Sequence, residues 1–273
     1  MDEALQARVG ATPDVTLAYR AAVGTIRPIM RALTRQDWQG AQCLPARGGC
    51  VIAANHISHA DPFAVAHFLF DNGHPPFFLG KASLFELPLL GRWLTACEQV
   101  PVHRGDGRAV EAFRDAVAAV DAGRCVVVMP ESTITKDPLE WPMAGKTGAA
   151  RMALQTGVPV LPLGQWGAQE LLEPGGRFRP WGRPVMRMRL GPPVSLDDLR
   201  QRPLDARGLR EATQRIMSAI TTQVSLLRGE PAPEGVWDRV AGARVVPGDP
   251  RTGGRSHGAE AGAPTGADEG ATR

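Results

Sequence analysis

Apolar residues along this chain form short continuous runs that alternate with longer segments in which apolar positions recur at helical spacing. A short apolar run between turn signals is typical of a buried strand, and the longer periodic segments are typical of helices. Strands are therefore expected at 50–54, 75–80, 98–102, 124–129, 158–163 and 185–190, and helices at 14–38, 63–70, 82–96, 106–122, 146–155 and 206–228. Because strands alternate with helices, we predict an α/β domain with a mixed, largely parallel sheet flanked by helices.

Two of these runs also indicate where their strands lie in the sheet. After Arg124, the run 124–129 is apolar throughout, which favours a central strand covered on both faces. The run 158–163 contains Pro159 and Pro162, and proline within sheets is mostly confined to edges because it has no N–H to donate. We therefore expect 124–129 in the centre and 158–163 near an edge.

The chain divides into three predicted parts. Residues 1–40 form an N-terminal amphipathic helical segment, in which Gly24 and Pro28 should kink or split the helix. Residues 41–228 form the α/β domain. Residues 229–273 are rich in Gly, Ala, Pro and charge, and such a composition buries too little apolar surface to fold, so we expect disorder.

The N-terminal segment has two interpretations. Basic residues are interspersed among its apolar positions, so it could lie on an anionic membrane surface; alternatively it packs on the domain and its arginines are solvated. A second group of apolar residues, in the segment 82–96, could likewise contact a membrane or pack in the core, and core packing is slightly favoured. The arginines are Arg20, Arg27, Arg31 and Arg35, and the second group is Phe85, Leu87, Leu89, Leu90 and Trp93.

Composition narrows the setting. The net charge of +3 and the sequence pI of about 8.9 suit anionic phosphates or a membrane surface but are too weak to indicate nucleic acid. Cys43, Cys50, Cys97 and Cys125 have no paired spacing, which favours a reducing compartment. The acidic start does not resemble a signal peptide, and no apolar run reaches the ~20 residues that span a bilayer. We therefore expect a peripheral protein on the cytoplasmic face of the membrane.

The candidate chemistry lies in the turn after the run 50–54. His56 follows that strand, and Asp61 precedes Pro62 at the start of the next helix, so the two can form a general base and its orienting carboxylate. Asp61 could instead serve only as a helix cap. A metal site built from His56, His59 and Asp61 is a weaker hypothesis, because the usual second cluster of ligands is missing.

Further polar residues follow the other predicted strands. Lys81, Arg104 and Glu131 each stand at or just beyond a strand end, as His56 does. Because the carboxyl ends of parallel strands meet at one edge of a sheet, these four side chains are expected to form one site.

Four sequence blocks resemble the glycerolipid acyltransferases, in particular the 1-acyl-sn-glycerol-3-phosphate (lysophosphatidic acid) acyltransferases. Residues 55–61 (Asn-His-Ile-Ser-His-Ala-Asp) match the family's Asn-His-x-Ser-x-x-Asp block, an instance of His-x4-Asp. Residues 100–104, 129–134 and 158–163 resemble the second, third and fourth blocks, in the family's order. The resemblance covers roughly residues 48–192.

The resemblance implies transfer of an acyl group from a thioester, acyl-coenzyme A or acyl carrier protein, to the sn-2 hydroxyl of the lysolipid, giving phosphatidic acid. His56 would be the base and Asp61 its orienter, with no metal or bound cofactor. The other residues are expected to contact substrate or to support the site: Arg104 at the acceptor phosphate with Lys81 as helper, Glu131 at the glycerol hydroxyl or orienting the loop, and Ser132, Thr133, Asn55 and Ser58.

The third block departs from the family pattern. Ser132 stands where most members have Gly, and Ile134 stands where they have Arg. Losing the Arg removes a possible phosphate contact, which Lys136 could replace as a point charge. Two alternatives follow: the same chemistry on another lysolipid or glycolipid, and a catalytically silent, membrane-associated lipid-binding protein.

Overall fold

The computed structural model describes residues 15–102 and 108–246, and these residues form a sheet of seven strands in the order β1-β7-β6-β2-β5-β3-β4. Five neighbouring strands from β6 to β4 are parallel, whereas β7 is antiparallel to β6 and parallel to β1. The predicted α/β fold with a mixed, largely parallel sheet is confirmed. The strands are β1 (Arg35–Gln39), β2 (Cys50–Ala54), β3 (Pro76–Lys81), β4 (Val100–Val102), β5 (Cys125–Val128), β6 (Val160–Trp166) and β7 (Val185–Leu190).

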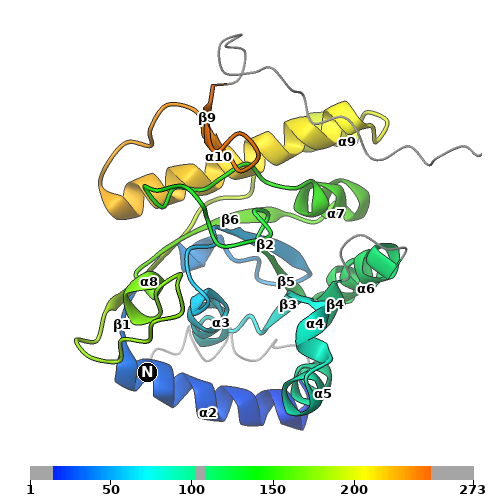
Figure 1. The fold of residues 1–273 in the computed structure, drawn as a ribbon. Coiled ribbons are helices and arrows are strands. Elements are labelled where there is room, and N and C mark those ends of the chain that lie inside the picture. The colour runs from blue at the N-terminus through cyan, green and yellow to red at the C-terminus, as the bar shows by residue number, and fades with distance from the viewer. Residues whose placement is uncertain (1–14, 103–107, 247–273) are drawn as a thin grey trace, which may run out of the picture.

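Helices cover both faces of the sheet, so that it is the middle of three layers (Figure 1). Alternate residues of β2 point to opposite faces: Val51 and Ala53 pack with α6, α7 and α10, while Ile52 and Ala54 pack with α2 and α3. The helices are α2 (Leu17–Leu33), α3 (Asp61–Asp71), α4 (Ala82–Phe85), α5 (Pro88–Ala96), α6 (Arg108–Asp121), α7 (Gly148–Thr156), α8 (Ala168–Leu171), α9 (Asp197–Arg200) and α10 (Ala206–Arg228), with a 3-10 turn at Ala41–Cys43.

The expected centre of the sheet is correct, but the expected edge is not. β5 lies between β2 and β3, as its continuous apolar run predicts. β6 lies in the interior between β7 and β2 despite Pro162. The Pro162 carbonyl accepts the N–H of Gly191 at 2.8 Å, beyond the last ladder pair between Leu163 and Leu190. The nitrogen of Pro162 therefore also faces Gly191, and the missing N–H removes one hydrogen bond at the end of the β6–β7 ladder.

The N-terminal segment differs from the predicted kinked helix. α2 continues unbroken through Gly24 and Pro28, and Thr16 caps its start by accepting the N–H of Tyr19 at 3.1 Å. Packing against α3 and α5 stabilises the helix despite the hydrogen bond that proline removes. Residues 35–39, predicted as the end of this helix, form β1, which pairs with β7. The sheet therefore begins before residue 41.

The expectation of disorder from residue 229 is wrong for the described part of that tail, and residues 247–273 lie outside the described range. β8 (Val236–Asp238) and β9 (Ala243–Val245) form an antiparallel hairpin. Arg244 pairs with the buried Asp137, and Met143 forms a bridge with Trp237. The composition of this segment does not predict either of these two contacts.

Candidate active site

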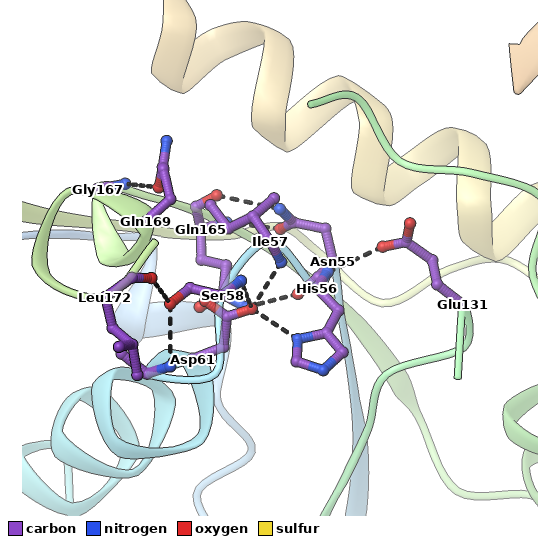
Figure 2. Close-up of polar contacts among 11 residues, drawn as sticks. Asn55, His56, Ile57, Ser58, Asp61, Glu131, Gln165, Gly167, Gln169 and Leu172 are labelled. Carbon is purple, nitrogen blue, oxygen red and sulfur yellow. Dashed lines mark hydrogen bonds and ion pairs between the residues drawn. The ribbon is translucent and has the colours of Figure 1, made fainter. Parts of the chain in front are cut away.

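The turn between β2 and α3 brings His56 and Asp61 together. The ring Nδ1–H of His56 donates to Oδ2 of Asp61 at 2.7 Å, and the main-chain N–H groups of Ile57 and Ser58 donate to the same oxygen at 2.6 and 2.9 Å (Figure 2). Asp61 is itself the first residue of α3, with Ala60 in the capping position and no capping side chain. The carboxylate therefore orients the histidine and does not act as an N-cap.

Burial dominates the electrostatics of this pair. Asp61 is fully buried, and this burial raises its pKa, while the hydrogen bonds from His56, Ser58 and Ile57 act in the opposite direction. Because Nδ1 of His56 is engaged by Asp61, only Nε2 is free to face a reactant. The His56 side chain is 17% exposed and contributes to the wall of a cavity.

Glu131, in the loop that follows β5, holds the main chain of His56. Its Oε1 accepts the N–H of His56 at 2.8 Å and its Oε2 accepts the N–H of Met143 at 2.9 Å. The carbonyl of His56 in turn accepts the N–H of Thr135 at 2.8 Å. Burial raises the pKa of Glu131 to about 8, against the two N–H donors that lower it, with Asp61 and Asp137 nearby raising it further. Both oxygens thus bond to main-chain N–H groups of the loops around His56, and Glu131 does not line the cavity, which favours the loop-orienting role.

Two other predicted substrate contacts also have structural roles. Asn55 is fully buried and exchanges hydrogen bonds with Gln165 of β6, donating to its carbonyl at 3.1 Å and accepting its N–H at 2.8 Å. The Ser58 hydroxyl donates to the Leu172 carbonyl at 2.5 Å and accepts the N–H of Ala60 at 3.0 Å. Both residues hold the turn in shape and neither lines the cavity, and their contact with substrate stays a prediction.

A cavity of about 1100 Å³ lies beside His56. Its wall is mostly apolar and is formed by α2, α3, β3, α4 and α5, with the end of β5 closing it near the histidine. Ser132 and Thr133 line it, and their contact with substrate stays a prediction. The backbone of Ser132 is left-handed, with a φ of 60°. Representative apolar lining residues are Val23, Ile26, Phe63, Phe70, Phe85 and Trp93.

The two predicted phosphate ligands are less well defined. Lys81 is the last residue of β3, and the neighbouring Gly80 lines the cavity, which agrees with a place at the strand end. Arg104 lies outside the described residues. Their contact with an acceptor phosphate stays a prediction.

Sequence reasoning missed several residues that shape the site. Gln165, Thr135, Met143 and Leu172 each hold a catalytic or neighbouring residue through a main-chain or amide hydrogen bond. They lie far from residues 55–61 along the chain, and main-chain hydrogen bonds leave no residue-type signal in a sequence. Together the geometry gives an oriented histidine beside an apolar cavity, which suits removal of a proton from the hydroxyl of an amphiphile.

This chain is similar to known acyltransferases. Residues 35–166 match the family model described as Acyltransferase. The 1-acyl-sn-glycerol-3-phosphate acyltransferase BAT2, chloroplastic, of Brassica napus is 32% identical over 143 residues, which cover 52% of this chain and 40% of that protein. The 1-acyl-sn-glycerol-3-phosphate acyltransferase of Borreliella burgdorferi is 28% identical over 125 residues, covering 45% of this chain and 48% of that protein. The chain thus matches less than half the length of these curated relatives.

A solved structure shares the fold. The 1-acyl-sn-glycerophosphate (LPA) acyltransferase PlsC from Thermotoga maritima superposes with a TM-score of 0.57 at 20% identity, covering 79% of this chain and 83% of that one. At this identity the likeness supports the arrangement of the sheet and its helices.

Proposed function

We propose that this chain, in which residues 35–166 match the Acyltransferase family model, transfers a fatty acyl group from acyl-coenzyme A or acyl carrier protein to the sn-2 hydroxyl of 1-acyl-sn-glycerol-3-phosphate, giving phosphatidic acid. The observation that carries this proposal is the His56–Asp61 pair, whose 2.7 Å hydrogen bond leaves Nε2 beside an apolar cavity. An alcohol is a weak nucleophile until a base removes its proton, and an oriented histidine supplies that base.

The reaction follows from this geometry. Nε2 of His56 takes the proton of the acceptor hydroxyl while the hydroxyl oxygen attacks the thioester carbonyl carbon. Asp61 accepts the Nδ1–H and stabilises the imidazolium that forms. The carbon–sulfur bond then breaks, the acyl group stays on the acceptor oxygen, and the proton on His56 passes to the leaving thiolate. No nucleophilic serine or cysteine is required.

The cavity supports the choice of an amphiphilic substrate. Its apolar wall offers burial to an acyl chain, and each methylene removed from water contributes about 0.8 kcal/mol. Phe85 and Trp93, two of the residues whose packing the sequence left open, line this cavity. They are therefore available to the chain of a bound lipid.

The surface near the cavity supports a peripheral position on a membrane. Leu89 is 85% exposed, and Leu87 and Ile29 are also exposed, although core packing was favoured for the two leucines. The exposed Arg20 on α2 adds a positive charge on the same helix as Ile29. Apolar and basic groups together suit an anionic bilayer surface such as the cytoplasmic leaflet. No helix among the described residues is long and apolar enough to cross a bilayer.

Ile134 favours a second candidate acceptor. It is 6% exposed and apolar at the position where the resembled family has Arg, so it offers no charge to a phosphate. The same chemistry on a lysolipid with another headgroup is therefore the alternative that this residue motivates.

The experiment is an acceptor panel with purified protein and palmitoyl-coenzyme A. Free thiol and acylated lipid are measured with 1-acyl-sn-glycerol-3-phosphate, lysophosphatidylcholine, lysophosphatidylethanolamine and monoacylglycerol. The proposal predicts phosphatidic acid as the main product. Turnover with only one of the other acceptors would contradict the proposal and support the alternative lysolipid. No turnover with either acyl-coenzyme A or acyl carrier protein as donor would favour a catalytically silent lipid-binding protein.

A further inference from the structure

The charged residues that line the cavity beside His56 are all basic. No aspartate or glutamate among the described residues lines it, whereas Arg27, Lys136 and Lys146 do. Arg27 is paired with Asp71, which also accepts from Arg31. The two lysines have no carboxylate within ion-pair distance in the described part of the chain, and both side chains are exposed. The cavity therefore offers two unneutralised positive charges to a ligand.

Lysine is rare in this chain, so the position of two lysines at the cavity is informative. Of the 31 basic Lys and Arg residues in the chain, three are lysines: Lys81, Lys136 and Lys146. Two of them line the cavity, and the third ends β3 next to a residue that lines it. In a chain that otherwise uses arginine, both lysines whose side chains the structure describes line the same cavity.

Main-chain hydrogen bonds place both lysines on segments fastened around His56. Thr135, which donates to the His56 carbonyl at 2.8 Å, directly precedes Lys136. The N–H of Lys146 donates to the Pro130 carbonyl at 2.9 Å, and Pro130 directly precedes Glu131, which holds the His56 N–H. Both lysines thus lie in the segment between β5 and α7, which is hydrogen-bonded to the N–H and to the carbonyl of His56.

Neighbouring groups suit an anion as well. Ser132, Thr133 and Thr147 contribute hydroxyl-bearing residues to the same wall, and Gly148, the first residue of α7, also lines it. Hydroxyl groups donate readily to phosphate oxygens, and ammonium groups act on phosphate as point charges. The exposed position of the lysines matches a headgroup that stays in water while its chain enters the apolar part of the cavity.

We propose that Lys136 and Lys146 form the subsite for the phosphate monoester of the acceptor lipid, and so take the place of the arginine that Ile134 replaces. The inference rests on the proposed function, because the lysines determine specificity for a phosphate-bearing acceptor in that reaction. The phosphates of coenzyme A have the same chemistry, so the experiment must separate donor from acceptor.

The kinetic test compares Lys136→Gln, Lys146→Gln and the double variant with wild type. The proposal predicts that KM for 1-acyl-sn-glycerol-3-phosphate rises roughly 10-fold or more in the double variant, as expected for lost hydrogen bonds to a charged group. KM for palmitoyl-coenzyme A should change little. Arg210→Gln, which removes an exposed charge on α10, is the matched control and should behave as wild type. A rise in KM confined to the donor, or no rise in either KM, would overturn the proposal.

A binding measurement tests the phosphate subsite without requiring that the protein transfers an acyl group. Hexadecyl phosphate and hexadecanol have the same alkyl chain and differ only in the phosphate group. Neither is a lysolipid with an sn-2 hydroxyl, so binding is measured without acyl transfer. Titration calorimetry should show that the double Gln variant loses affinity for hexadecyl phosphate but not for hexadecanol, and that the double Arg variant regains it. Equal affinity of wild type and the double Gln variant for hexadecyl phosphate would overturn the inference even if the enzyme acylates the lysolipid.

Discussion

Glu131 and His56 are joined through the main chain and not through the imidazole. The carboxylate accepts the His56 N–H at 2.8 Å and the Met143 N–H at 2.9 Å, while burial leaves Glu131 only 3% exposed. The residue that follows β5 therefore fixes the backbone on which the base is carried. Activity and stability should both depend on this carboxyl group, although it does not line the cavity.

Glu131→Gln is expected to lower both the activity and the stability of the protein. The –NH2 of glutamine cannot accept a hydrogen bond, whereas both oxygens of the Glu131 carboxyl group can, even when it carries a proton. One of the two N–H donors is therefore left unpaired, which costs about 1–3 kcal/mol of unfolding free energy. A displaced His56 should also lower kcat by about 10- to 100-fold, with KM changing less. Urea unfolding and steady-state kinetics measure the two effects. A variant as stable and as active as wild type would contradict the positioning role.

The same variant gives a prediction for pH. The pKa of Glu131 is raised from 4.5 to about 8 in the folded protein, so the folded state holds a proton that the unfolded state releases near 4.5. The stability contributed by this proton is fully present below pH 4.5 and is lost as pH rises through about 8. The difference in unfolding free energy between wild type and Glu131→Gln, measured by urea unfolding from pH 5 to pH 8.5, should therefore shrink with rising pH. A difference that grows with pH would show that the folded protein favours the ionised carboxylate.

Asp61→Asn tests the orienting carboxylate. Asparagine can still accept the N–H groups of Ile57 and Ser58, so we expect the turn to fold, but it cannot balance the charge of an imidazolium. The expected loss in kcat is roughly 10²- to 10⁴-fold, with KM for the thioester nearly unchanged. Thermal unfolding verifies that the variant is folded. Retention of wild-type kcat would remove Asp61 from the mechanism.

Arg244→Met tests the C-terminal hairpin. Its partner Asp137 has no exposed side-chain surface, so the variant leaves a buried charge without its cation, and breaking such a pair costs about 3–5 kcal/mol. Adding Asp137→Asn should recover part of this loss, because the carboxylate is then neutral. A double-mutant cycle by urea unfolding measures the coupling. Strictly additive losses would show that the pair does not hold the hairpin to the loop.

Ser132 allows a test of backbone strain. Its φ of 60° lies in the left-handed region, which costs a residue with a Cβ roughly 1–2 kcal/mol. Ser132→Gly should therefore be more stable than Ser132→Ala by about 1 kcal/mol, since both lack the hydroxyl and only alanine keeps the strain. Thermal unfolding of the two variants side by side gives the answer. An alanine variant at least as stable as the glycine variant would mean that the loop relaxes to another conformation.

The sequence predicted the parts of the fold that depend on local patterns. The apolar run of β5 indicated its central place, and residues 55–61 indicated the paired His56 and Asp61. Alternation of apolar and basic residues also indicated β7, whose Met186, Met188 and Leu190 are buried while the arginines between them are not. In each case the signal lies in neighbouring residues.

What the sequence did not predict depends on contacts between distant segments. β6 is an interior strand although it contains Pro162, because the neighbouring ladder happens to end at that residue. β1 is a strand only because it pairs with β7, far along the chain. Asn55 was expected to contact substrate, and Glu131 either to contact substrate or to orient the loop. Their bonds to Gln165 and to the His56 main chain, which no local pattern indicates, show that both hold the backbone of the site.

The most direct test of the central claim is the rate of acyl transfer from palmitoyl-coenzyme A to 1-acyl-sn-glycerol-3-phosphate by His56→Ala. His59→Ala is measured alongside it, because His59 is a nearby histidine with no carboxylate partner among the described residues. If His56 is the base, its replacement lowers kcat at least about 100-fold in a folded protein, and the His59 variant keeps most of its activity. Wild-type turnover by His56→Ala would contradict the account.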